Sequence, residues 1–294
     1  MGKIEKIRII CSTVNGNRFV VGESEKNVHI WDITKGFINS LVTDLNSDTD
    51  SPISLSENGA QMAVAGYDKN TVTLYNIKKK SILWQRKDFK NPLNVIILDR
   101  YNNLIFLETE NHGSFFIDRK TGEPIESLKD VEFVKENPYS TMDLFRKKSI
   151  SIVINRTNRK EVNRFRHSSF AMLDSCFTSD KIICSYSGNP LLAISLTSFQ
   201  TLWTTRVVGH FLEIEYCEQL NKILGIRWEY EKGSPKYLSY INVETGEIEK
   251  EIDIGNPIAI NFLKKGGFIL TSQGKLYSAE SGQIINQFDF DEGH

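Results

Sequence analysis

The stretch NVHIWDITKGFINSLV, residues 27–42, combines a strand, a tight turn and a second strand. From Val28 to Ile33 successive side chains alternate between two faces, which is the period-two pattern of a strand. The turn falls at Thr34-Lys35-Gly36, where Gly36 can adopt a positive φ. The chain is extended again from Phe37 to Val42. The stretch therefore predicts a β-hairpin, and we take it as the basic unit of the protein.

Similar units of four short strands recur along the chain with a period of about 40 residues, the size of a propeller blade. A single unit exposes two apolar faces and two edges, and stacking the units in a ring buries the faces. We therefore predict an all-β protein, a single seven-bladed β-propeller of four-stranded antiparallel blades. The expected blades span roughly residues 1–43, 44–89, 90–129, 130–165, 166–208, 209–254 and 255–294.

The third strand of each unit should carry one apolar anchor. These anchors are predicted at Trp31, Tyr75, Phe116, Val153, Ala193, Tyr240 and Tyr277. We find no helical periodicity, and the longest irregular stretches are residues 43–51 and 129–143. Because both ends of the chain carry complete units, we expect the ring to close by packing of the first blade on the last. A short strand pairing by Lys3–Ile7 is the alternative.

The composition is that of a folded protein without a global attraction for nucleic acid or membranes. Hydrophobic residues make up 40% of the chain and charged residues 25%, and the net charge is -1. The four cysteines, Cys11, Cys176, Cys184 and Cys217, form no CxxC pair, so we expect buried reduced thiols and a reducing compartment. We see no signal peptide and no apolar run that could span a bilayer. We therefore expect a cytoplasmic (intracellular) protein that does not contact membranes.

Two segments resemble WD repeats. They are VVGESEKNVHIWDI (Val20–Ile33), whose Trp31-Asp32 matches the dipeptide that names the family, and AVAGYDKNTVTLYNI (Ala63–Ile77). Gly209-His210 is similar to the Gly-His pair that opens such a repeat. The resemblance implies a propeller and structural roles for Trp31, Asp32 and His210. In the family, this histidine bonds a turn aspartate and a strand serine or threonine.

A second pattern is similar to quinoprotein-type propeller repeats. Trp84 and Trp203 fall on expected fourth strands, and Thr-Gly-Glu turns begin at Thr121 and Thr245. Both resemblances imply a propeller, and neither defines a ligand.

The sequence contains no GxSxG, HExxH, P-loop or GxGxxG motif. We therefore expect no catalytic residues, no cofactor and no metal, and we do not expect an enzyme. Asp44, Asp48 and Asp50 lie in one loop at a spacing that a calcium site could use. The glycine bend and the final glutamate of an EF-hand loop are missing, so we favour a solvated acidic loop.

Two segments are candidates for partner binding. The stretch Arg146–His167 is strongly basic; it places Arg156, Arg159 and Lys160 in a hairpin turn, and Arg164 and Arg166 on or just past the outer strand. Such a cluster could dock phosphate or an acidic protein, or it could be a charged outer strand that prevents edge-to-edge association. In the segment 227–232, Trp228 and Tyr230 are possible anchors for a partner. The alternative for Trp228 is packing between blades.

The first functional hypothesis is a non-catalytic WD-repeat-like scaffold that binds a protein or peptide partner on one face of the propeller. Such a protein would be a monomer or a member of a hetero-complex. The alternatives are a propeller enzyme with a metal in the central channel, and a sensor of nucleic acid or acidic ligands that uses the basic fourth blade. Nucleic acid is the less favoured partner, because aromatic residues are sparse in the basic segment.

Overall fold

The structure, a computed structural model, describes residues 8–288 with short gaps. The gaps are residues 13–17, 23–26, 43–51, 57, 66–69, 88, 90–92, 99–103, 110–112, 130, 148–149, 167–171, 188–189, 207–208, 229–235, 256, 258–259 and 264–266.

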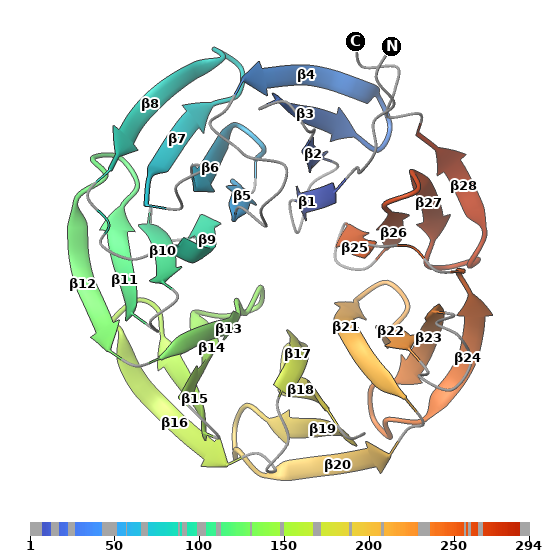
Figure 1. The fold of residues 1–294 in the computed structure, drawn as a ribbon. Coiled ribbons are helices and arrows are strands. Elements are labelled where there is room, and N and C mark those ends of the chain that lie inside the picture. Colours follow the sequence, from blue (N-terminus) through green and yellow to red (C-terminus); the bar gives the residue numbers. More distant parts are fainter. Residues whose placement is uncertain are drawn as a thin grey trace.

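In these residues the chain forms seven four-stranded antiparallel sheets, each built from strands that follow one another in the sequence. The sheets stand around a common axis, with the first strand of each sheet nearest the axis and the fourth on the outside (Figure 1). The prediction of an all-β propeller of four-stranded antiparallel sheets is confirmed.

The strands of the first four sheets have the following bounds. The first sheet holds β1 (Arg8–Ser12), β2 (Arg18–Gly22), β3 (Asn27–Asp32) and β4 (Gly36–Val42). The second holds β5 (Ile53–Leu55), β6 (Gln61–Ala65), β7 (Val72–Asn76) and β8 (Ser81–Arg86). The third holds β9 (Leu93–Leu98), β10 (Leu104–Thr109), β11 (Gly113–Asp118) and β12 (Pro124–Lys129). The fourth holds β13 (Glu132–Lys135), β14 (Met142–Lys147), β15 (Ile150–Asn155) and β16 (Lys160–Arg166).

The remaining sheets follow in the same order. The fifth holds β17 (Met172–Phe177), β18 (Lys181–Tyr186), β19 (Pro190–Ser195) and β20 (Thr201–Arg206). The sixth holds β21 (His210–Cys217), β22 (Lys222–Trp228), β23 (Lys236–Asn242) and β24 (Ile248–Asp253). The seventh holds β25 (Ile260–Leu263), β26 (Phe268–Thr271), β27 (Lys275–Ser278) and β28 (Ile284–Gln287).

The hydrophobic core is divided among the interfaces between neighbouring sheets. Between the first and second sheets, for example, Val28 and Ile30 of β3 pack with Met62 and Val64 of β6. Equivalent clusters lie between each later pair of sheets. Each sheet is therefore buried on both faces by its neighbours, as the ring hypothesis requires.

The ring closes by packing of the first sheet against the last. Trp31 and Ile33 share a cluster with Leu263, Leu270, Leu276 and Phe288. The Trp31 and Phe288 rings meet edge to face, with centroids 5.9 Å apart. This agrees with the closure that we expected. The alternative pairing by Lys3–Ile7 lies outside the described residues.

The register corrects four of the predicted anchors. In every sheet the pairing of third and fourth strands shifts by one residue at an equivalent place, such as between Ile30 and Trp31 in the first sheet. The equivalents of Trp31 are Tyr75, Ile117, Ile154, Ile194, Ile241 and Tyr277. The anchors predicted at Phe116, Val153, Ala193 and Tyr240 lie one residue earlier, so they face the opposite neighbour. Alternation could not show this, because both faces of the third strand are buried.

One predicted irregular stretch contains a strand. Residues 129–143 were expected to be irregular, yet they include β13 and the start of β14. The β13–β14 pairing covers few residues and is interrupted by a register shift between Phe133 and Lys135. A strand this short gives too few alternating positions to be recognised from its sequence.

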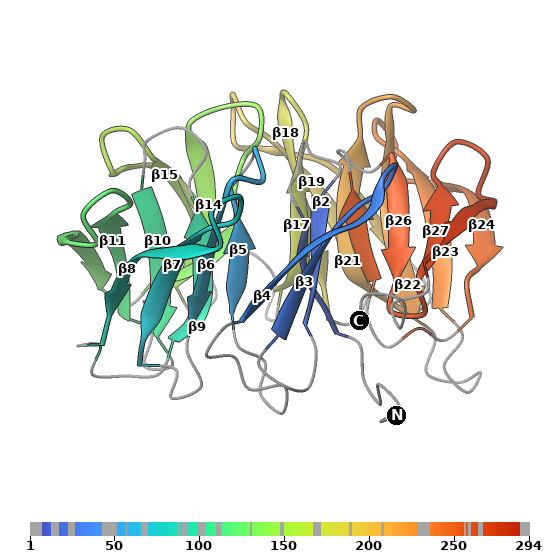
Figure 2. The ribbon, with the colours of Figure 1, turned by 90° about the horizontal axis from the view of Figure 1, so that it is seen from above.

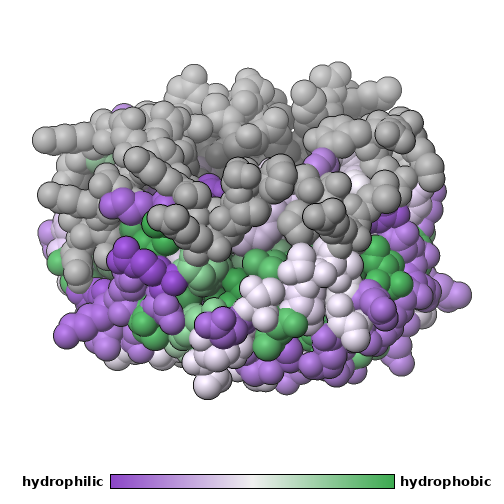
Figure 3. All heavy atoms as spheres, turned by 90° about the horizontal axis from the view of Figure 1, so that it is seen from below, coloured by the Kyte–Doolittle hydropathy of each residue, from purple (hydrophilic) through white to green (hydrophobic). Residues whose placement is uncertain are grey.

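The outer wall carries isolated apolar side chains. Those on the fourth strands include Ile82, Leu83, Ile125, Val162, Leu202, Ile284 and Ile285. Figure 3 shows one side of the ring, where hydrophobic and hydrophilic residues are interspersed in the coloured part of the surface. Scattered apolar residues of this kind are normal on protein surfaces.

Candidate interaction rim

Each sheet is a meander, so the turn between its first and second strands and the turn between its third and fourth strands lie at the same end. These turns face one side of the ring, the upper side in Figure 2. We call this side the turn rim. The described residues cover all of its third-to-fourth-strand turns.

A side-chain cap holds each third-to-fourth-strand turn. In the first sheet, Asp32 Oδ1 accepts hydrogen bonds from the backbone N–H groups of Thr34 and Lys35, at 2.9 and 3.2 Å. The equivalent capping residues are Asn76, Asp118, Asn155, Ser195, Asn242 and Ser278. Because Asp, Asn and Ser side chains mimic a backbone turn in this way, the tips of the rim are held in one conformation.

The two aspartate caps are held in the ionised form. Burial acts to raise the pKa of Asp32, but hydrogen bonds from Thr34 and Lys35 outweigh it and lower the pKa. Backbone donation from Thr121 is the largest cause of the lowered pKa of Asp118. The role of Asp32 that the WD resemblance implies is structural, and its geometry here is that of a turn cap.

Two tryptophans form hydrogen bonds between neighbouring sheets beneath the rim. Trp84 of β8 donates its indole N–H to the carbonyl of Arg119 in the next sheet at 2.8 Å, and Trp203 of β20 donates to Val243 at 3.1 Å. A Cβ built on Gly122 would lie 3.1 Å from Trp84 Cδ2, and one on Gly246 would overlap Thr205 Oγ1 and lie 2.6 Å from the Trp203 ring. The glycines of the Thr-Gly-Glu turns therefore let the turn approach the indole of the preceding sheet.

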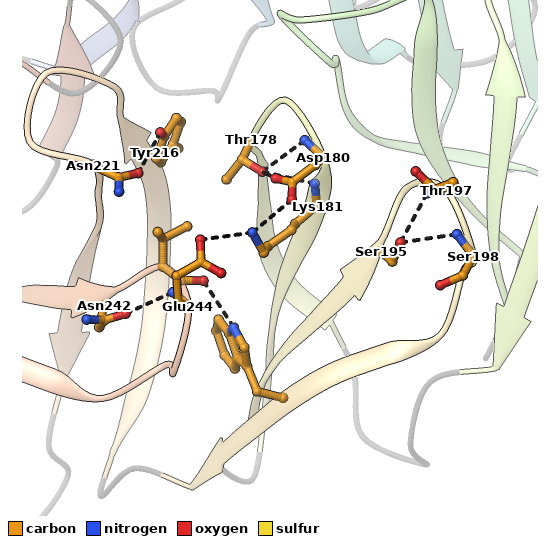
Figure 4. A network of polar contacts seen from close by, with 12 residues as sticks. Thr178, Asp180, Lys181, Ser195, Thr197, Ser198, Tyr216, Asn221, Asn242 and Glu244 are labelled. Atoms are coloured by element: carbon orange, nitrogen blue, oxygen red, sulfur yellow. Dashed lines mark hydrogen bonds and ion pairs between the residues drawn. The ribbon is translucent and has the colours of Figure 1, made fainter.

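Charged side chains add a tie between the fifth and sixth sheets (Figure 4). Lys181 Nζ lies 2.9 Å from Asp180 Oδ2 and 3.1 Å from Glu244 Oε1. Burial acts to lower the pKa of Lys181, but Asp180 and Glu244 outweigh it and raise the pKa. Thr178 Oγ1 also donates to Asp180, at 2.8 Å. Lys181 is thus paired on both sides of the boundary between the sheets.

Lysines gather on the turn rim of the first four sheets. They lie in or beside the third-to-fourth-strand turns, and we call them the basic arc: Lys35, Lys78, Lys79, Lys80, Lys120 and Lys160. All are exposed, and none of their ammonium groups has a hydrogen bond or ion pair within the part of the chain that the structure describes. Arg119 and Arg159 stand beside them and are half-buried.

The other three sheets present acidic residues at the same rim. We call these exposed residues the acidic arc: Asp180, Glu218, Glu244, Glu247 and Glu280. Among the described residues of this half, the rim lysines are Lys181, paired as above, and Lys222, which pairs with Glu249 at 2.7 Å. The described residues of the turn rim therefore carry opposite signs of charge on its two halves.

Arg156, a predicted partner-binding residue, is buried in the turn between β15 and β16 of the fourth sheet. Its guanidinium pairs with both carboxylate oxygens of Asp143 and lies 3.2 Å from Glu136 Oε1. Its side chain is 2% exposed, so it cannot meet a partner on the surface. These residues and four phenylalanines, Phe106, Phe116, Phe133 and Phe145, line a small, partly open pocket. Its volume is about 10 Å³, which is room for about one water molecule and far below the usual range for small-molecule sites.

The other basic candidates differ in how available they are. Arg159 is half-buried, with its guanidinium 5.9 Å from the centre of the Phe116 ring. Lys160 is exposed and belongs to the basic arc. Arg164 is exposed and paired with Glu161 in a bidentate ion pair, both distances being 2.6 Å. Arg166 ends β16, and its side chain is outside the described set. The structure thus does not gather these residues into one exposed cluster.

Of the two aromatic candidates, the described one, Trp228, lies away from the turn rim. Trp228 is half-buried at the end of β22, where it pairs in register with His210 and Lys236. Tyr230 is outside the described residues. His210, which has a structural role in the WD resemblance, is the first residue of β21 and follows Gly209, whose φ is 91°. Trp31 lies in the closure cluster between the first and last sheets.

Near the axis, charged residues of three innermost strands meet. Lys135 of β13 lies 3.6 Å from Asp174 Oδ1 of β17 and 3.4 Å from Glu215 Oε2 of β21. Asp174 also accepts the backbone N–H of Ile214 at 2.8 Å. Burial acts to lower the pKa of Lys135, but the carboxylates of Asp174 and Glu215 outweigh it, so the pKa is raised. This triad connects the fourth, fifth and sixth sheets.

Several further expectations concern metals, thiols and membranes. Within the described ranges, no group of His, Cys, Asp or Glu residues could hold a metal ion, and the loop with Asp44, Asp48 and Asp50 is outside them. Cys176, Cys184 and Cys217 are buried free thiols, and the Cys11 side chain is not described. A helix with the length and apolarity to cross a bilayer is not found in the described residues.

Sequence reasoning missed most of the basic arc. It identified Lys160 but not Lys35, Lys78–Lys80 or Lys120, which are far apart in the sequence. The signal is present, because these lysines fall within a few residues of the equivalent caps of successive repeats. Aligning the repeats on their caps would have shown it.

The chain matches no protein-family profile and no curated protein sequence.

Proposed function

We propose that this protein is a single seven-bladed, WD-repeat-like propeller that acts as a non-catalytic scaffold and binds a protein partner on the turn rim. The observation that carries the proposal is the construction of this rim. Its seven third-to-fourth-strand turns are each capped by a side chain and stand on sheets that are buried on both faces. Turns held on a rigid framework are common sites of recognition.

The distribution of charged residues also supports the turn rim as the binding face. Exposed lysines without ion pairs, within the described residues, contribute little to the stability of the fold, yet they recur on four successive sheets. A reducing intracellular location fits the three buried free thiols.

The hypothesis of a nucleic-acid or acidic-ligand sensor depends on basic residues of the fourth sheet, and two of them are not available to a ligand. Arg156 is buried in an ion pair and Arg164 is paired with Glu161. The basic surface instead continues over the first three sheets, which a scaffold explains as well as a sensor does. No observation favours the metal-channel enzyme.

A steric block tests the proposal without altering charge. Thr157 and Thr197 are exposed residues of the rim turns, and Val162 is an exposed residue of the outer strand β16. Each is replaced by cysteine and labelled with a bulky neutral maleimide, while the native described thiols are buried. Proteins that co-purify from cells of the source organism should be lost with the Thr157→Cys and Thr197→Cys labels and kept with the Val162→Cys label. Equal recovery with all three labels, or no co-purifying protein, would refute a partner site on this rim.

A further inference from the structure

We propose that the basic arc is the docking surface for an acidic, aspartate- and glutamate-rich segment of the partner protein. This inference rests on the proposed function, since it defines the chemistry of the partner at the turn rim. It requires that the lysines be available, that they lie on one continuous surface and that they select protein over nucleic acid.

The lysines of the basic arc are available. All six side chains are exposed, and the ammonium groups make no bond to any residue that the structure describes. The other lysines that the structure describes on the rim are different, because Lys181 and Lys222 are both neutralised by carboxylates. Among the described residues, carboxylates near the basic arc are already engaged: Asp32 and Asp118 cap turns, and Glu123 pairs with Arg86 at 3.3 Å.

The arc is continuous because its members lie in or beside the same turn of four neighbouring sheets. The backbone N–H groups of Lys35, Lys79 and Lys120 each bond to the cap of their own turn, at 3.2, 2.9 and 2.9 Å. The lysines therefore start from fixed points on four adjacent sheets, and long flexible side chains extend from them. A row of point charges suits an extended segment of variable sequence better than a single shaped ligand.

The negative charge of the acidic arc favours a protein over a nucleic acid as the partner. A nucleic acid is uniformly negative, so the acidic arc would repel whatever part of it extended beyond the basic arc. The net charge of -1 provides no compensating attraction for a polyanion. A protein can present acidic residues to the first four sheets and basic or neutral residues to the other three, and complementary charge of this kind fixes orientation.

The test uses two matched charge reversals. One variant carries Lys78→Glu, Lys79→Glu and Lys80→Glu in the central turn of the arc. The control carries Lys87→Glu, Lys147→Glu and Lys250→Glu, which are exposed lysines outside the arc with the same total charge change. Thermal melting of both variants checks that they are folded. Fluorescence anisotropy then measures binding of a labelled oligoglutamate peptide and of an oligothymidylate with equal net charge.

We expect the wild type to bind oligoglutamate at low ionic strength, with affinity falling as salt is added. The Lys78–Lys80 reversal should weaken this binding by about tenfold or more, and the control by less than about twofold. Oligothymidylate should bind more weakly than the peptide. An equal effect of both reversals, absence of peptide binding, or tighter binding of the oligonucleotide through the same lysines would overturn the inference.

The outcome is separable from that of the proposed function. If the native partner is lost with the rim labels but is kept by the Lys78–Lys80 reversal, the rim is a binding face and the acidic-segment inference is wrong. If the partner is kept with the rim labels, the proposed function fails, whatever the peptide measurement shows.

Discussion

Glu213 shows how one residue responds to its position near the axis. It lies on the innermost strand β21, and its carboxylate has neither a hydrogen bond nor an ion pair with a described residue. Burial, with a smaller contribution from Asp174, raises its pKa to about 7, against the opposing effects of Lys135 and Lys236. An unfolded glutamate titrates near pH 4.3, so the folded state binds the extra proton between these values.

This shift predicts that stability falls as the pH rises. The folded state holds more protons than the unfolded state from about pH 4.3 to about pH 7, so the free energy of unfolding decreases over this interval. Because the side chain is partly exposed, we expect a loss of about 1–2 kcal/mol between about pH 5 and about pH 8. Urea unfolding at both pH values should show this loss in the wild type and in Glu247→Gln, an exposed control. Glu213→Gln should lack it, and an identical pH dependence in Glu213→Gln would contradict the assignment.

Arg156 shows the limit of reasoning from single residues. A run of basic residues predicts an exposed basic surface, and most of its members could meet solvent. Arg156 instead points inward, because its guanidinium pairs with Asp143 of β14 and with Glu136 of the turn before β14. Only the pairing of β14 with β15 brings Asp143 and Arg156 together.

At the scale of elements, the hairpin between third and fourth strands is the repeated unit. It combines a cap at the end of the third strand with a one-residue register shift, and both recur in every sheet. In two of these turns, a glycine at positive φ meets the tryptophan of the preceding sheet. The turn therefore also serves as the contact between neighbouring sheets.

Gly246 and Gly255 form a matched pair for testing that contact. Both have φ of +75°, but a Cβ on Gly246 would overlap Thr205 Oγ1 and lie 2.6 Å from the Trp203 ring, whereas one on Gly255 would meet nothing within 4 Å. Alanine at either position bears the cost of the left-handed conformation, and alanine at 246 also displaces the side chains of Trp203 and Thr205. We expect Gly246→Ala to lose about 1–3 kcal/mol more than Gly255→Ala in chemical denaturation. Similar losses for both variants would show that Trp203 does not depend on the close approach.

At the scale of the whole molecule, the ring is held by the sum of its sheet-to-sheet interfaces. Each sheet is formed by one continuous segment, so strands are not exchanged between the two ends in the described residues. Within these residues, the first and last sheets meet by side-chain packing, in a cluster that includes Trp31.

Trp31→Ala should weaken the closure of the ring. Removing a buried tryptophan side chain leaves a cavity between the first and seventh sheets and should cost about 3–5 kcal/mol in the free energy of unfolding. Ile38→Ala, on the exposed side of β4 in the same sheet, should change it little, because Ile38 is 36% exposed. Urea denaturation compares the two variants. A loss below about 1 kcal/mol for Trp31→Ala would mean that the closure does not depend on this contact.

The sequence by itself determined the fold class, because strand alternation, glycine turns and the period of the repeats are local properties. It also located most of the strands and the glycine turns that receive Trp84 and Trp203. The tertiary structure decided which face of each third strand meets which neighbour, since both faces are apolar and alternation is the same for either register. It also decided that Arg156 is buried and that lysines from four distant segments share one rim. Those properties depend on contacts between residues far apart in the chain, and no local pattern encodes them.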